Sequence, residues 1–279
     1  MAGVLPALII VFREVFEAGL VIGIVLAVTQ GVPRRGLWIS GGVAAGVLGS
    51  CLMAAFAGVI SQAFAGSGQE LVNATVLLIA VVMLTWHNVW MARHGRELAA
   101  EFRAAGEAVA AGSKSLVALA VVVCVAVLRE GFEVVMFLYG VLATEGATGF
   151  EVFIGGVAGM FLGALVCAAT YFGMLTIPQR YLFGVTSFMI AFLAAGMAAQ
   201  AIGFLEQANV VLALDRVVWD SSWLLSDTSI LGRVLRTLIG YNDRPTVMQL
   251  TVYCATLAVM FSLMKLLAPP PRGRHPVTA

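Results

Sequence analysis

The chain has 279 residues, of which 61% are apolar and only 11% are charged, and its formal net charge is +1. These few polar side chains cannot cover the surface of a water-soluble globule of this size. The composition therefore excludes a soluble globular protein and predicts an integral membrane protein surrounded by the lipid bilayer. The small net charge gives no indication of a nucleic-acid partner.

Seven apolar runs follow one another along the chain, each long enough for the roughly 20 residues that cross a hydrocarbon core. The first run carries charges in its middle and lacks the basic segment and cleavage site of a signal peptide, so we expect it to be a retained helix. We therefore expect a single all-α membrane domain with seven transmembrane helices. The runs lie at about 4–29, 37–64, 70–92, 115–143, 150–176, 181–206 and 247–268.

Two polar segments interrupt these runs. Residues 93–114 alternate in charge and contain strong helix formers, which predicts a helical cytoplasmic connector. Residues 207–246 contain a stripe of apolar residues beginning at Trp219, which predicts an outer loop with an amphipathic helix at the membrane interface. Arginine and lysine are in excess on the side of the membrane that holds the predicted connector, and such an excess marks the cytoplasmic side. With seven spans, the N-terminus is therefore expected outside the cell membrane, and the C-terminal tail is expected in the cytoplasm.

The chain also repeats itself. The sequence GGVAAGVLG from Gly41 resembles GGVAGMFLG from Gly155, and the runs that precede these two segments share a charged motif. Because each copy holds three spans, the second copy enters the membrane in the opposite direction, as in secondary transporters built from inverted repeats. We expect repeats at 1–92 and 115–206, with 247–279 forming an extra seventh helix and the tail.

The charged motif is the strongest functional signal. It appears as REVFE in the first run and REGFE in the fourth, at a depth of about 14 Å in the first helix at 1.5 Å per residue. Six unpaired charges inside a bilayer would cost on the order of 15–20 kcal/mol, so these side chains must meet one another. The groups are Arg13, Glu14 and Glu17 in the first motif, and Arg129, Glu130 and Glu133 in the second.

Four carboxylates and two guanidinium groups leave a formal charge of −2, which favours a cation. Carboxylate oxygens suit hard cations, and no cluster of histidine or cysteine lies at neighbouring positions. We expect Glu14, Glu17, Glu130 and Glu133 to bind the ion. We expect Arg13 and Arg129 to support them by keeping the carboxylates ionised and oriented.

Both motifs resemble the paired Arg-Glu-x-x-Glu motifs of the oxidase-dependent, high-affinity iron permease family, which has fungal and bacterial members. The resemblance extends to LTWHNVWM in the third run, AAGMAAQAIGFLEQ in the sixth and SILGRVLRTLIGYNDRP before the last. It implies import of ferric iron, with no permanently bound cofactor and with an oxidase or iron-delivery partner outside the membrane. The first motif departs from the family at Val15 and Phe16, where Gly-Leu is usual, and Asn73 stands where relatives often carry an acid.

Three further polar residues are candidates for the ion's route. Gln200 and Glu206 lie near the outer end of the sixth run, and His87 lies near the inner end of the third. A hydrated or hydrogen-bonded structural role is the simpler interpretation for Glu206 and His87. We expect a permease rather than an enzyme. The alternatives are a permease for ferrous iron, manganese or lead, an intramembrane metalloenzyme, and a sensor or assembly subunit.

Overall fold

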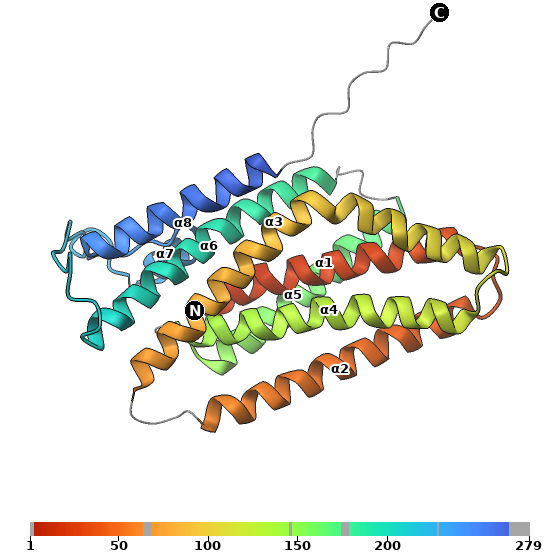
Figure 1. The fold of residues 1–279 in the computed structure, drawn as a ribbon, viewed down its shortest axis with the longest axis horizontal. Helices are drawn as coiled ribbons and strands as arrows, with labels where there is room; N and C mark the ends of the chain where they lie inside the picture. The colour runs from red at the N-terminus through yellow and green to blue at the C-terminus, as the bar shows by residue number, and fades with distance from the viewer. Residues whose placement is uncertain (1–2, 64–67, 145–146, 174–178, 228, 268–279) are drawn as a thin grey trace, which may run out of the picture.

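The computed structural model describes residues 3–63, 68–144, 147–173, 179–227 and 229–267 (Figure 1). Within these residues the chain forms eight α-helices, most of them running side by side in one elongated bundle. The helices are α1 (Val4–Val28), α2 (Arg35–Ala63), α3 (Gln69–Ala110), α4 (Leu116–Leu142), α5 (Gly149–Tyr171), α6 (Gln179–Gln207), α7 (Ile230–Ile239) and α8 (Val247–Leu266).

Side chains at the helix starts explain several of these boundaries. The hydroxyl groups of Ser115, Thr148 and Ser229 accept hydrogen bonds from the first turns of α4, α5 and α7. Thr246 and Gln249 form a reciprocal capping box at the start of α8. Each of these residues satisfies backbone groups that a helix terminus leaves without an intrahelical partner.

Five of the described helices are long and apolar enough to cross a membrane, judged by length and composition: α2, α3, α5, α6 and α8. Two further helices, α1 and α4, are of similar length at 25 and 27 residues. Each of these carries the three charges of a motif near its middle. Seven crossings therefore remain a prediction, in which α1 and α4 would supply the other two.

Three helix pairs dominate the packing: α1 lies along α5, α2 along α4, and α3 along α6. Glycines let two of these pairs approach closely. A methyl group on Gly159 of α5 would lie 2.5 Å from the carbonyl oxygen of Leu8, and one on Gly42 of α2 would lie 2.5 Å from that of Ala120. Small residues at such contacts are the usual means of close helix packing in membranes.

The segment predicted as a cytoplasmic connector is helical, and it is continuous with the third span. α3 runs for 42 residues without a break, ends at Ala110 and is followed by Gly112 at a φ of 75°. Its last turns are packed rather than fully solvated, because Val109 is buried in a cluster with Val25 and Leu119. The extension of α3 therefore covers the end of α1 and the start of α4.

The prediction of a helical stripe beginning at Trp219 was wrong in its first half. Trp219 lies in irregular chain and Trp223 in a turn, and the helix begins only at Ile230. α7 packs against α6, where Gly196 and Gly240 bring the two backbones together. The hydrogen bonds of Ser221 with the carbonyl of Asp243 and with Tyr241 hold the preceding chain in turns instead.

Candidate functional site

The first motif lies on the buried face of α1. Arg13, Glu14 and Glu17 are 1%, 1% and 3% exposed. Because residues four apart share a helix face, Arg13 reaches Glu17, with 2.9 Å between its Nε and the carboxylate Oε1. A longer contact of 3.8 Å joins Arg13 Nη1 to Glu14 Oε1. The arginine is thus held mainly by Glu17, which leaves Glu14 the less engaged carboxylate.

The second motif lies on α4 and is less enclosed. Glu130 is buried, whereas the side chain of Arg129 is 33% exposed. Arg129 Nε lies 3.4 Å from Glu133 Oε1 and 3.9 Å from Glu130 Oε1. Its guanidinium carbon also lies 4.3 Å from the ring centre of Trp90 on α3, a cation–π contact. The two arginines, matched in sequence, therefore have different surroundings.

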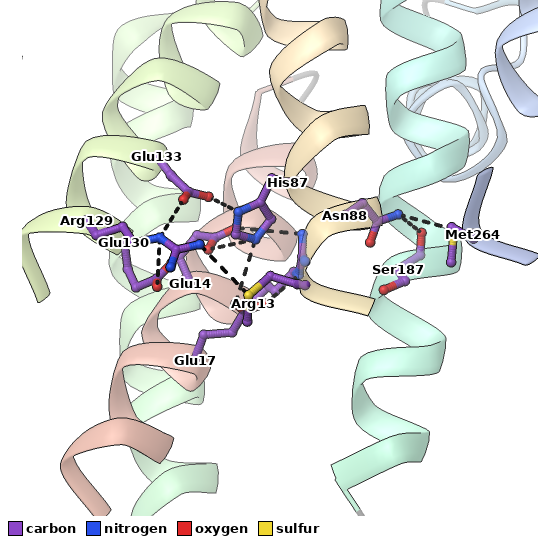
Figure 2. Close-up of polar contacts among 11 residues, drawn as sticks. Arg13, Glu14, Glu17, His87, Asn88, Arg129, Glu130, Glu133, Ser187 and Met264 are labelled. Carbon is purple, nitrogen blue, oxygen red and sulfur yellow. Dashed lines mark hydrogen bonds and ion pairs between the residues drawn. The ribbon is translucent and has the colours of Figure 1, made fainter. Parts of the chain in front are cut away.

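His87 of α3 lies between the two motifs (Figure 2). Its Nε2 lies 3.7 Å from Glu14 Oε2 and 3.7 Å from Glu17 Oε2 on one side. Its Nδ1 contacts Glu133 Oε2 directly on the other. The imidazole is 4% exposed and packs edge-on against Phe137. A third helix thus contributes to the site, and it bridges the carboxylates of α1 and α4.

Four of these residues are close enough to hold one metal ion. Glu14, His87, Glu130 and Glu133 each offer a ligand atom, and these atoms lie within 4.8 Å of one another. Two ligands on opposite sides of an ion, each about 2.1 Å from it, would be about 4.2 Å apart, so only a small contraction is needed. In the described part of the chain, neither oxygen of Glu14 accepts a hydrogen bond. A buried carboxylate that accepts no hydrogen bond favours a bound cation.

Asn88 links α3 to two neighbouring helices. Its side-chain amide donates to the carbonyl oxygen of Ser187 on α6 at 3.2 Å and contacts the sulfur of Met264 on α8 at 3.7 Å. Figure 2 shows Asn88 pointing away from the glutamates while His87 points toward them. The contacts of Asn88 therefore join this turn of α3 to α6 and α8, while the neighbouring imidazole points into the site.

The structure brings together three of the four glutamates predicted to bind the ion. Glu17 is beside them but outside the four-residue cluster, because it faces Arg13. His87, predicted only as a residue of the ion's route, takes the fourth place in the cluster. The sequence does contain a signal for this position. The buried stripe of α3 passes through Leu77 and Leu84, and the same helical spacing continues to His87.

The other two predicted route residues lie in a separate polar region. Glu206 accepts hydrogen bonds from Thr246 Oγ1 at 2.7 Å and from Gln249 Nε2 at 3.2 Å, which joins the end of α6 to the start of α8. Gln200 lines a pocket between α6, α7 and α8 that also includes Asn242 and Gln249. The hydrogen bonds of Glu206 are those of a residue that joins two helices.

The segment between α6 and α8, predicted as an outer loop, shows little net attraction for cations. Asp220 lies 3.1 Å from Arg244, and Asp227 lies 3.3 Å from Arg236. Hydrogen bonds from the hydroxyl and amide of Ser222, and then from Arg244, hold the pKa of Asp220 below its ordinary value. Because each of these acids has a basic partner, the loop does not concentrate negative charge.

An all-helical bundle with several membrane-crossing helices and a buried carboxylate cluster is typical of a multi-pass transporter of cations. Family comparison agrees, because the iron permease FTR1 family matches residues 4–269. The chain belongs to this family.

Named relatives are similar over most of their length. The chain is 31% identical to the ferrous iron permease EfeU of Yersinia pestis over 270 residues, which is 95% of this chain and 93% of that protein. It is 30% identical to the protein of the same name from Escherichia coli O6:K15:H31 over 270 residues, covering 95% and 96% of the two chains. No solved structure matches the chain.

Proposed function

We propose that this protein imports iron across the cell membrane through the cluster formed by α1, α3 and α4. One observation carries the proposal. Acidic side chains from two helices, Glu14 on one and Glu130 and Glu133 on the other, converge with a histidine, and their ligand atoms lie within 4.8 Å of one another. Iron permease relatives match nearly the whole chain, which supports iron as the cargo.

Charge balance supports ferrous rather than ferric iron as that cargo. With a neutral imidazole, four glutamates and two arginines leave a formal charge of −2, which a divalent ion neutralises. A trivalent ion would leave one uncompensated charge in a region of low dielectric, which is costly. The relatives from Yersinia and Escherichia are named ferrous iron permeases. The ferric ion implied by the sequence resemblance is thus the alternative, and an outer oxidase or delivery partner remains a prediction.

The packing supports seven crossings arranged as two inverted repeats. Gly46 of α2 faces the carbonyl oxygen of Cys124, and Gly159 of α5 faces that of Leu8. Cys124 and Leu8 each precede their motif arginine by five residues, so the two contacts are equivalent under exchange of the repeats. These contacts make Gly46 the structural equivalent of Gly159. The alignment of the two similar sequences, which begins at Gly41 and Gly155, differs from this pairing by one residue.

Alternating access follows from that symmetry. With the N-terminus outside, Arg13 lies on the outer side of the cluster and Arg129 on the inner side. The side chain of Arg13 is 1% exposed and that of Arg129 is 33% exposed. During transport the carboxylates replace the hydration shell of the ion, and rocking of the repeats reverses which arginine is enclosed.

The test is iron uptake by Glu14→Gln and Glu130→Gln variants that reach the membrane in normal amounts. Uptake of radioactive iron should fall at least about 10-fold in each, because a buried ligand and its charge are lost. Glu101→Gln, on the exposed extension of α3, is the matched control. Supplying iron with ascorbate or as ferric citrate separates the two oxidation states. Undiminished uptake in both cluster variants would refute the proposed site.

A further inference from the structure

We propose that His87 is a direct ligand of the transported ion and that its Nε2 atom makes the site select divalent transition metals over Mg²⁺ and Ca²⁺. This inference rests on the proposed function, since it assigns a ligand and a substrate preference to the same cluster. It also changes the expected ligand set, which the sequence limits to carboxylates.

The two ring nitrogens have different surroundings. Nδ1 contacts the carboxylate of Glu133, and this contact would hold the ring proton on that side. Nε2 is buried, has no hydrogen-bond partner among the described residues, and faces Glu14 and Glu17 at 3.7 Å each. Histidines that bind metals commonly donate their other ring N–H to a carboxylate, which fixes the tautomer and the ring orientation. His87 has this arrangement before the ion arrives.

The ring is held firmly in this position. Phe137 packs edge-on against it, with 6.2 Å between the ring centres. The next residue, Asn88, ties the same turn of α3 to α6 and α8. A ligand whose rotamer is fixed by packing needs little reorganisation to bind, which makes the nitrogen a preorganised part of the site.

A nitrogen ligand changes which ions the site prefers. Sites made only of oxygen suit Mg²⁺, Ca²⁺ and Mn²⁺, whereas imidazole suits iron, zinc, nickel and copper. Replacing one of four oxygen ligands by imidazole therefore disfavours the abundant hard cations while it retains Fe²⁺. Carboxylates alone would not provide this discrimination, so His87 is the residue expected to determine it.

His94 provides an internal control on the same helix. Its ring stacks on Trp90 with 5.0 Å between centres, and its Nδ1 lies 3.2 Å from the carbonyl oxygen of Trp90. It is not part of the cluster that His87 shares with the glutamates. Replacing His94 changes the number of imidazoles on α3 without removing the proposed ligand.

The experiment uses Mn²⁺ as a paramagnetic probe bound to the full-length protein in lipid nanodiscs. Pulsed electron paramagnetic resonance should detect coupling to a coordinated imidazole ¹⁴N in the wild type and in His94→Gln, and the coupling should disappear in His87→Gln. Labelling the wild type with [¹⁵N]histidine should shift the coupling frequencies, which gives a result that does not depend on whether a variant folds. Persistence of the signal in His87→Gln, or its absence from the wild type, would overturn the assignment.

Binding and competition measurements separate this inference from the proposed function. If Mn²⁺ binding is insensitive to Glu14→Gln and Glu130→Gln, the cluster itself is refuted. If binding needs both glutamates but shows no nitrogen coupling, only the role of His87 is refuted. In His87→Gln, the apparent affinity for Fe²⁺ should fall about 10- to 100-fold, and Ca²⁺ should inhibit iron uptake more strongly than in the wild type. Unchanged selectivity would contradict the proposed preference.

Discussion

Replacing Gly159 by alanine should disturb the site from a distance. The added methyl group would lie 2.5 Å from the carbonyl oxygen of Leu8 and 2.9 Å from the amide nitrogen of Phe12, whereas ordinary contact begins at 3.4 Å. Both atoms belong to the α1 backbone just before Arg13, so α1 and α5 must separate by about 1 Å. Overpacking of this kind costs about 1–3 kcal/mol, and a 1 Å displacement of a functional group can cost about 100-fold in rate.

Gly156→Ala is the matched control for this substitution. The methyl group there would meet only Val11, at an ordinary contact distance of 3.7 Å. Both variants gain the same intrinsic helix propensity, at most about 1 kcal/mol, so their difference isolates the steric effect. We expect iron uptake to fall about 10- to 100-fold and the unfolding temperature in detergent to drop in Gly159→Ala alone. Equal uptake and equal thermal stability in the two variants would refute the reasoning.

Two further predictions concern the other half of the molecule and the arginines. Gly42→Ala should impair iron uptake and thermal stability, because its methyl group would lie 2.5 Å from the carbonyl oxygen of Ala120. Gly41→Ala has open space around the added methyl group and should impair neither. Measurements of iron uptake and of the unfolding temperature decide this. Arg13→Lys should reduce uptake at least about 10-fold more than Arg129→Lys, since a buried, closely paired guanidinium loses more than a partly exposed one. Equal losses in the two lysine variants would contradict the asymmetry between the motifs.

The sequence by itself determined the class of the protein and named most of the residues that meet in its candidate site. Apolar runs long enough to span a bilayer predicted an all-helical membrane protein, because such runs must satisfy their backbone hydrogen bonds within helices. The two motifs were recognisable since charges are costly inside apolar runs, and their i, i+4 spacing placed Arg13 beside Glu17. The helical character of residues 93–110 also followed from local propensity.

Only the tertiary structure decided which side chains meet. His87 joins the cluster because α3 packs between the motif helices and α6. A sequence gives the spacing of residues along α3 but not the direction in which each face of the helix points. The division between Glu14, which lies in the four-residue cluster, and Glu17, which pairs with Arg13, was likewise visible only in the structure. The start of α7 was misplaced for the same reason, since hydrogen bonds to Asp243 and Tyr241 override the apolar stripe that begins at Trp219.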